Sequence, residues 1–307
     1  MSKPRARARS ASSVPSAEPS GAAPGGQPPR RLAPGLYVVA TPIGNLGDIT
    51  LRALEILRAV DLVACEDSRV TAKLLTHYGI RKPLLPYHEH NAARARPVLL
   101  ERLAAGAAVA LVSDAGTPLL SDPGFKLVRA ALEAGHAVVP LPGASAALAA
   151  LVASGLPSDR FLFAGFVPSG DAARRSWLGA LAAIEATLIV YESPRRLAES
   201  LTAMAAVLGD RPAAVGRELT KLFEETRRGR LSELAAHYRA AGAPKGEVAV
   251  TIGPPEARRE EPATLDAALR AALARTSLKQ AVAEVAASTG ASRRTVYARA
   301  LALKGGG

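Results

Sequence analysis

The sequence contains very little cysteine and few aromatic residues. Its 307 residues include a single cysteine, Cys65, and only 4% Phe, Trp and Tyr. One cysteine excludes a disulfide within the chain and favours a reducing compartment, so we expect a cytoplasmic protein. No apolar run reaches the ~18 residues that span a bilayer. The Gly-x-Gly-x-x-G turn of dinucleotide-binding Rossmann folds is also missing after the first expected strand.

Positive charge is concentrated at the two ends of the chain. The net charge is +12, and six basic residues against one acidic residue give +5 in residues 1–35. Nine basic and five acidic residues give +4 in residues 256–307. This distribution suits a polyanionic partner such as RNA, DNA or a ribosomal particle. A role in solubility alone is the open alternative.

Residues 1–34 differ from the rest of the chain. They are rich in Pro, Ala, Ser, Gly and Arg and have almost no large apolar side chains, which predicts a disordered basic tail rather than a transit peptide. Hydrophobic residues make up 49% of the chain, and at ~150 residues per domain the length predicts about two domains.

Short apolar runs alternate with helical patterns over residues 35–155. Strands are expected at 36–40, 61–65, 83–87 and 109–112 and from 138 onward. Helices are expected at 49–59, 69–78, 94–105, 124–134 and 145–153. The alternation predicts an α/β domain with a mostly parallel sheet that is covered on both faces.

A second α/β domain, with a mixed sheet, is expected over residues 156–254. Its expected strands are 161–166, 187–191, 213–217 and 247–252, with a helix at 178–184 and a polar hairpin at 223–229. Residues 255–307 predict a charged linker followed by a helix-turn-helix-like segment, in which Gly290 ends one helix and Ser292 caps the next. A plain helical hairpin that packs on the body is the alternative.

Small and polar residues follow three of the expected strands. They occupy positions 40–48, 113–118 and 142–146. Ligands of open α/β sheets bind past the carboxyl ends of the strands, and small residues let a ligand approach the backbone. Three such strand ends together predict one shared ligand site, although any one of them fits an ordinary strand-to-helix loop.

Six motifs occur in order at 39–48, 65–69, 113–118, 121–124, 142–146 and 191–196. Together they resemble the tetrapyrrole methylase superfamily of S-adenosylmethionine-dependent methyltransferases, over about residues 35–304. Within it they look most like the branch that methylates a cytidine ribose 2′-hydroxyl in 16S ribosomal RNA of the small subunit. The sequence 40–44 replaces the Gly-x-Gly-Pro-Gly loop of porphyrin-type members, and 116–118 replaces their Gly-Asp-Pro. Both departures match the RNA branch.

The resemblance implies two α/β domains with S-adenosyl-L-methionine in the cleft between them. It also implies a homodimer that acts on the small ribosomal subunit or its RNA, away from membranes. Carried over motif by motif, the donor contacts are Pro42, Ala115, Gly116, Thr117, Ser145, Ala146 and Tyr191. We add Asp114, because a carboxylate can accept hydrogen bonds from donor amino or hydroxyl groups. The alternatives are a tetrapyrrole methyltransferase and a non-catalytic nucleic-acid-binding regulator.

A ribose hydroxyl is weakly acidic, so its methylation benefits from a proton acceptor. The candidates for this base are Glu66, Asp67, His88 and Glu218. Glu66 and Asp67 equally fit acids that stabilise a helix N-terminus. His88, with Glu89 and His90, lacks further metal ligands, so no metal is expected. The candidates for RNA phosphate contacts are Arg69, Arg195, Arg196, Arg217, Lys221, Arg293 and Arg294.

Overall fold

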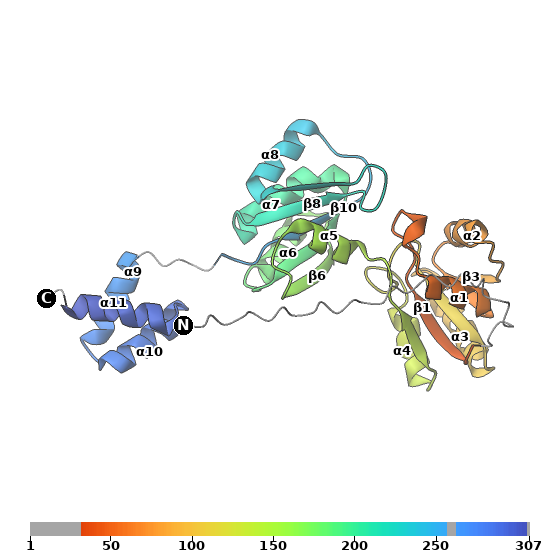
Figure 1. Ribbon diagram of the computed structural model, residues 1–307, viewed down its shortest axis with the longest axis horizontal. Coiled ribbons are helices and arrows are strands. Elements are labelled where there is room, and N and C mark those ends of the chain that lie inside the picture. Colours follow the sequence, from red (N-terminus) through yellow and green to blue (C-terminus); the bar gives the residue numbers. More distant parts are fainter. Residues whose placement is uncertain (1–31, 257–261, 306–307) are drawn as a thin grey trace, which may run out of the picture. The chain divides into compact units, whose positions relative to one another are not determined.

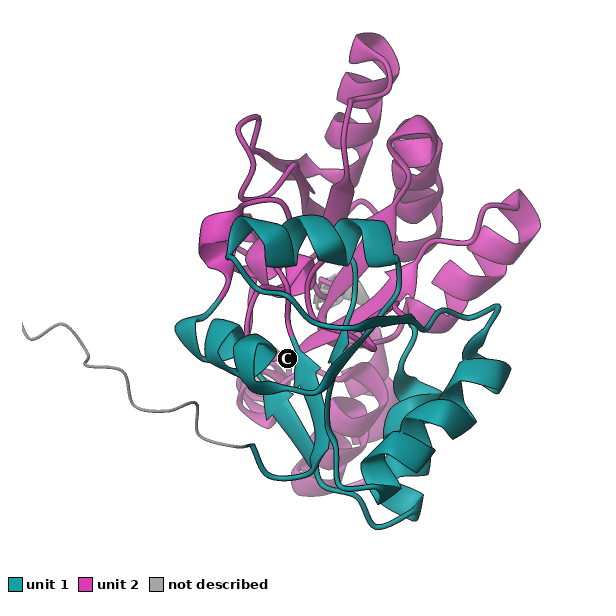
Figure 2. Cartoon of the chain, turned by 90° about the vertical axis from the view of Figure 1, so that its right-hand side faces the viewer, with its two compact units in different colours: residues 1–39, 50–114, 123–141 teal, residues 40–49, 115–122, 142–307 magenta. Residues whose placement is uncertain are grey.

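The computed structural model describes residues 32–256 and 262–305, shown in Figure 1. Most of the predicted tail and the centre of the predicted linker lie outside these residues. The chain forms two compact units, coloured in Figure 2. Unit 1 runs to residue 39 and also includes residues 50–114 and 123–141, whereas unit 2 comprises residues 40–49, 115–122 and 142–307. The loops at 40–49 and 115–122 therefore belong to unit 2, although the strands that precede them belong to unit 1.

Unit 1 is built on a parallel sheet in the order β3-β2-β4-β1-β5. All of its strand pairs are parallel, which confirms the predicted α/β class. The central strand β4 is buried along its whole length, as its continuous apolar run predicts. The strands are β1 Gly35–Val39, β2 Leu62–Cys65, β3 Leu84–Pro86, β4 Ala108–Val112 and β5 Val138–Leu141.

The helices of unit 1 begin and end at residues that the sequence indicates. Thr50 caps α1, since its side chain accepts a hydrogen bond from the Ala53 amide, and Asp67 caps α2 through the Arg69 amide. Gly79 follows the end of α2 with a φ of +65°, which favours glycine there. The helices are α1 Leu51–Ala59, α2 Ser68–His77, α3 Ala92–Ala104 and α4 Phe125–Glu133.

Unit 2 contains a mixed sheet, as predicted, and its strand order is β6-β7-β10-β8-β9. Only its β6–β7 pair is parallel. The strands are β6 Phe161–Phe166, β7 Thr187–Glu192, β8 Pro212–Arg217, β9 Glu225–Arg230 and β10 Val248–Ile252. The helices are η1 Leu46–Asp48, α5 Ala146–Ser154, α6 Asp171–Leu181, η2 Pro194–Arg196, α7 Leu197–Leu208 and α8 Leu231–Ala241.

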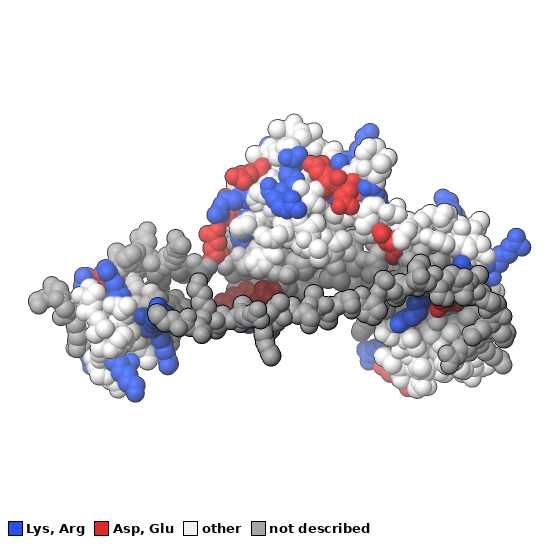
Figure 3. Space-filling model, viewed as in Figure 1, with Lys and Arg blue, Asp and Glu red and all other residues white. Residues whose placement is uncertain are grey.

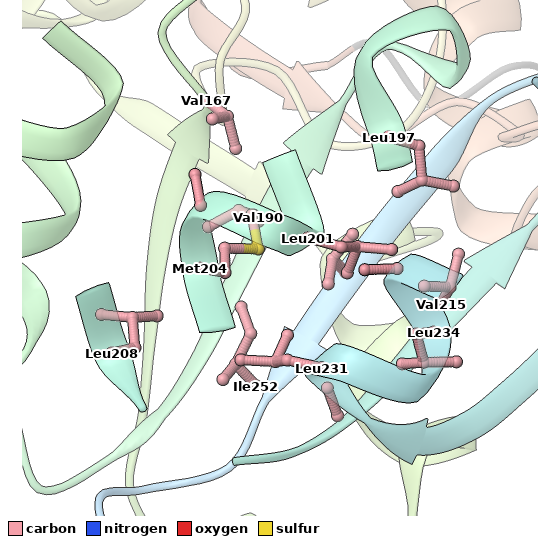
Figure 4. Packing of buried hydrophobic residues seen from close by; sticks show 14 of the residues in the cluster. Val167, Val190, Leu197, Leu201, Met204, Leu208, Val215, Leu231, Leu234 and Ile252 are labelled. Carbon is pink, nitrogen blue, oxygen red and sulfur yellow. The ribbon is translucent and has the colours of Figure 1, made fainter. Parts of the chain in front are cut away.

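The main core of unit 2 lies between the sheet and helices α6, α7 and α8. Leu201 and Met204 of α7 are fully buried there, together with Val190 of β7 and Ile252 of β10 (Figure 4). Ile189, which has the opposite strand parity to Val190, instead packs with α5. Helix α5 therefore covers the second face of the sheet.

Two predictions in unit 2 are wrong. The helix expected at 178–184 is α6, Asp171–Leu181, whose first turns are stabilised by ion pairs from Asp171 to Arg174 and Arg175 rather than marked by an apolar period. Residues 223–229 do not form a hairpin by themselves. Residues 225–230 are β9, which pairs with β8 at the edge of the sheet, so its charged side chains remain solvated. The sequence patterns also did not indicate α7 and α8.

The C-terminal residues form three helices, which are α9 Pro262–Leu273, α10 Leu278–Thr289 and α11 Arg293–Gly305. They have a core of their own, which includes Leu269, Val285 and Val296. Gly290 ends α10 in a left-handed conformation, and Ser292 Oγ accepts a hydrogen bond from the Thr295 amide at the start of α11. The helix end at Gly290 and the cap at Ser292 are as predicted. None of the helices in the described ranges is long and apolar enough to cross a membrane.

Candidate active site

The three loops that follow β1, β4 and β5 contact one another. Thr41 and Gly116 form an antiparallel bridge with two backbone hydrogen bonds of 2.9 and 3.0 Å. Thr117 Oγ1 donates to the Ala144 carbonyl over 3.0 Å. A Cβ at Gly143 would lie 2.8 Å from the Ala40 Cβ, so the loops approach too closely for any larger residue there. The structure thus brings together the three loops that the sequence singled out.

Two observations explain why residue 116, in the loop that follows β4, is a glycine. Its φ is +82°, which L side chains rarely adopt. A Cβ at this position would also lie 3.2 Å from Ile43 Cγ2 and 3.6 Å from the Ala144 carbonyl oxygen. The backbone conformation therefore favours glycine, and a Cβ at this position would also require the Ile43 side chain to shift slightly.

Ser145 has a buried hydroxyl without a hydrogen-bond partner in the described part of the chain. It is the N-cap residue of α5, and Ala146 begins the helix. A buried hydroxyl without a partner is costly unless a ligand or water meets it. The residues present here therefore fit a polar ligand bound at these loops.

Tyr191 lies at the end of β7 beside the same loops. It packs with Ile43, Ala144 and Ala146, and burial raises the pKa of its hydroxyl. Its ring meets Phe163 edge-on, with centroids 4.9 Å apart. Pro42 is buried, and Ala115 is exposed. Of the predicted donor contacts, all except Asp114 thus lie in unit 2.

Three neighbouring strands of unit 1 end in ionisable residues. Glu66 and Asp67 follow β2, His88 follows β3 and Asp114 follows β4. Asp114 Oδ1 accepts a hydrogen bond of 2.9 Å from the Asp67 amide, 47 residues away in the sequence. Burial, and then the charge of Asp114, raise the pKa of Glu66. The structure therefore places three of the four base candidates at one edge of this sheet.

Asp67 differs from its neighbour Glu66 in its electrostatics. The side chain and amide of Arg69 donate hydrogen bonds to it and lower its pKa to about 2. The Arg69 Nη2 to Asp67 Oδ2 distance is 2.6 Å. Asp67 is also the N-cap of α2, which agrees with the alternative of a helix N-terminal acid. Such a carboxylate is a weak base.

His88 lies in a polar turn, where its amide donates to Asn91 Oδ1 over 2.9 Å. Its ring lies 6.0 Å, between centroids, from that of His90. Across residues 32–256 and 262–305, no group of three or more His, Cys, Asp or Glu side chains is arranged to hold a metal ion.

Glu218, the fourth base candidate, belongs to unit 2 and is held in an ion pair. Lys221 Nζ lies 2.9 Å from Glu218 Oε1 and 2.8 Å from Glu247 Oε2, and its hydrogen bond lowers the pKa of Glu218. The carbon chain of Lys221 lies against Gly44, where a Cβ would come within 2.4 Å of it. Lys221 thus connects the β8–β9 loop to the loop that follows β1.

The arginines predicted to contact RNA fall into two groups. Arg196 is bonded to the buried Glu192, with 2.6 Å between Nη2 and Oε1, and Arg217 is paired with Glu225 at 3.3 Å. Arg195 is exposed and has no ion-pair or hydrogen-bond partner among the described residues. Arg293 and Arg294 are exposed in the same way at the start of α11. Residues 262–305 contain seven Lys and Arg and two Asp and Glu, and blue predominates there in Figure 3.

Comparison with known families agrees with this arrangement. The family model of the Tetrapyrrole (Corrin/Porphyrin) Methylases matches residues 35–235, which contain all three loops. The chain belongs to the tetrapyrrole methylase family. A second model, the RsmI C-terminal HTH domain, matches residues 259–304 of this methylase.

Two curated relatives of this methylase family member carry the same name, Ribosomal RNA small subunit methyltransferase I. The protein from Mesorhizobium japonicum is 58% identical over 278 residues, which cover 90% of this chain and 95% of the relative. The protein from Escherichia coli O157:H7 is 46% identical over 273 residues, which cover 88% and 96%.

Two solved structures share the fold. Diphthine synthase matches with a TM-score of 0.56 and 20% identity, over 71% of this chain and 89% of its own. Uroporphyrin-III C-methyltransferase from Thermus thermophilus, complexed with S-adenyl homocysteine, matches with a TM-score of 0.50 and 21% identity, over 71% and 97%.

Sequence reasoning missed one buried polar network in this methylase. Glu192, at the end of β7, accepts hydrogen bonds from the Ser193 amide, from Arg196 and from the hydroxyl of the buried Ser200. A glutamate directly after the apolar run 187–191 was the available signal, because an acid at the end of a buried strand needs partners.

Proposed function

We propose that this protein is an S-adenosylmethionine-dependent methyltransferase that methylates the ribose 2′-hydroxyl of a cytidine in 16S ribosomal RNA of the small subunit. The main support for this proposal is the high identity to a curated relative. Over 90% of its length the chain is 58% identical to a relative named Ribosomal RNA small subunit methyltransferase I. The basic helix-turn-helix at residues 259–304 supports a nucleic-acid substrate over a tetrapyrrole.

The methyl donor is held by the loops of unit 2 that contain Gly116, Thr117 and Ser145. Ala115 in the same loop as Gly116 is exposed, and the buried Ser145 hydroxyl has no hydrogen-bond partner among the described residues, so a polar group of the donor can bind it. Asp114 has one carboxylate oxygen bonded to the Asp67 amide. We assign its second oxygen to an amino or hydroxyl group of the donor. The T. thermophilus enzyme of the same fold was solved with S-adenyl homocysteine, which supports this choice of donor.

Glu66 is the general base in this proposal. The donor supplies an electrophilic methyl carbon on sulfur, and Glu66 takes the proton of the attacking 2′-hydroxyl. Burial and the nearby Asp114 raise its pKa, so it binds a proton more strongly than an ordinary glutamate. Asp67 and Glu218 are bound by cations that lower their pKa values, which makes them weaker bases. His88, which follows the neighbouring strand β3, remains the second candidate.

The remaining predictions follow from the same family assignment. We propose a cytoplasmic homodimer. RNA phosphates are bound by exposed arginines, of which Arg195, Arg293 and Arg294 have no protein partner in the described ranges. Arg69, Arg196 and Lys221 are already bonded to carboxylates, so their contacts with RNA require exchange of partners.

Methyl-labelled donor tests the function directly. The purified full chain is incubated with labelled S-adenosylmethionine and either unmodified small ribosomal subunits, free 16S RNA or a tetrapyrrole precursor. Digestion of the RNA to nucleosides should place the label on 2′-O-methylcytidine. Label on a base or on the tetrapyrrole, or none above background, would refute the proposal.

A matched pair of variants tests the base. Glu66→Gln keeps the size of the side chain and should lower the turnover number by about 10²–10⁴-fold, the range of general-base catalysis. Glu89→Gln changes an exposed glutamate three residues beyond β3 and should leave the turnover unchanged. An active Glu66→Gln enzyme would exclude Glu66 and leave His88 as the base.

A further inference from the structure

The carboxyl ends of β6 and β7 carry an exposed aromatic side chain. Phe166 is the last residue of β6, pairs with Tyr191 in the parallel ladder and is 61% exposed. Its ring meets that of Tyr191 at a centroid distance of 5.3 Å. The position is costly for an apolar ring in water, and it directly adjoins one of the proposed donor contacts.

An arginine without a partner follows the neighbouring strand. Arg195 lies in η2, which begins two residues after β7, and it is exposed with no hydrogen bond or ion pair in the part of the chain that the structure describes. Its neighbour Arg196 points instead into the protein, where Nη2 donates to the Val167 carbonyl over 3.5 Å and to Glu192. Two consecutive arginines thus have opposite environments.

Hydrogen bonds and core contacts fix these two strand ends to each other. The Val167 amide donates to the Tyr191 carbonyl over 3.0 Å, and Arg196 bridges back to Val167. Val167 and Leu197, both labelled in Figure 4, are 2% and 0% exposed and anchor the segments in the core. The backbone beside the exposed Phe166 and Arg195 is therefore held in place by hydrogen bonds and buried side chains.

We propose that Phe166 and Arg195 form a nucleotide clamp for the RNA substrate. Phe166 stacks on a base near the methylated cytidine, and Arg195 binds a backbone phosphate. Recognition of unpaired RNA uses this combination of aromatic stacking and cationic phosphate contact. The charge of Arg195 complements an anionic backbone, and a preorganised aromatic ring loses little entropy on binding. The clamp rests on the proposed function and adds the residues that position its substrate.

The test compares variants of the full chain in binding to unmodified small ribosomal subunits. Phe166→Leu should raise the Kd for subunits about 5- to 150-fold, the equivalent of one lost base stack. Phe166→Tyr should retain the affinity, because its ring also stacks. Phe161→Leu is the matched control, since Phe161 is the first residue of the same strand and is 46% exposed. It should bind subunits as the wild type does.

Salt dependence tests the arginine. Arg195→Ala should weaken binding and lower the slope of log Kd against log salt by about 0.7, as for one phosphate contact with single-stranded RNA. Donor affinity, measured by calorimetry, and oligomeric state, measured by sedimentation, should stay unchanged in both Phe166→Leu and Arg195→Ala.

Two kinds of result would overturn the clamp. One is subunit affinity equal to the wild type in Phe166→Leu and Arg195→Ala. The other is loss of donor binding or of the oligomer in place of subunit affinity, which would mean that these side chains bind the donor or a second copy. The methylation assay on the wild-type protein distinguishes failure of the clamp from failure of the proposed function. If wild-type protein labels 2′-O-methylcytidine while the variants bind normally, the clamp fails and the proposed function stands.

Discussion

Replacement of Arg196 by alanine should destabilise the protein strongly. Glu192 has no exposed side-chain surface, and Arg196, at 33% exposure, gives it two N–H donors, Nε at 3.0 Å and Nη2 at 2.6 Å. Loss of one partner of a buried ion pair costs about 3–5 kcal/mol. Glu192 retains the Ser193 amide and the Ser200 hydroxyl, so the lower end of the range, about 3 kcal/mol, is expected.

Thermal unfolding measures this loss. At about 2–4 °C per kcal/mol, Arg196→Ala should lower the Tm by about 6–12 °C. The Tm of Arg196→Lys should lie between those of Arg196→Ala and the wild type, because an ammonium group keeps the charge but cannot reproduce the paired N–H donors of a guanidinium. Arg195→Ala is the matched control, and its exposed, partnerless side chain should change the free energy of unfolding by less than about 0.5 kcal/mol.

The double variant decides whether the ion pair is the cause. If Arg196 acts through Glu192, then Glu192→Gln should reduce the further cost of Arg196→Ala, with a coupling of about 0.5–3 kcal/mol. Equal Tm losses in Arg195→Ala and Arg196→Ala, or purely additive effects in the double variant, would refute this reasoning.

Three further predictions concern the site. Gly116→Val should abolish donor binding in calorimetry. Gly106→Val is its control and should bind the donor normally, because Gly106 has the same left-handed backbone (φ +83° against +82°) but no atom within 4 Å of where a Cβ would lie. Both should lose about 1–2 kcal/mol of stability. The raised pKa of Glu66 means that methyl transfer should decline, as pH falls, at a higher pH than for an ordinary glutamate base, and Glu66→Gln should lack this decline. Replacing both Arg293 and Arg294 by alanine should weaken RNA binding and flatten its salt slope by roughly 1–2, with donor affinity intact, and an unchanged slope contradicts it.

Local patterns in the sequence determined most of the α/β framework. The apolar run 109–112 is too short for a stable isolated helix and too apolar for an exposed strand, so it predicted the buried strand β4. Thr50 and Gly290 indicated helix ends because capping and left-handed conformations depend on residues within a turn. The three loops of small residues were visible for the same reason, since each is one contiguous stretch.

Only the tertiary structure separated residues that are alike in sequence. Glu66 and Asp67 are adjacent acids, yet burial raises the pKa of the first and Arg69 lowers that of the second. Arg195 and Arg196 are adjacent arginines, yet only Arg196 reaches the buried Glu192.

The physical reason is that desolvation and ion pairing depend on what the fold brings near a side chain. Two such partners are distant in the sequence. Asp114 is 47 residues from Asp67, and the buried Ser200 is eight residues from Glu192. The roles that the sequence assigned to single acids and arginines therefore stay predictions. The position of β9 at the edge of the sheet was decided by its pairing with β8, because the charged sequence of β9 does not by itself encode a strand.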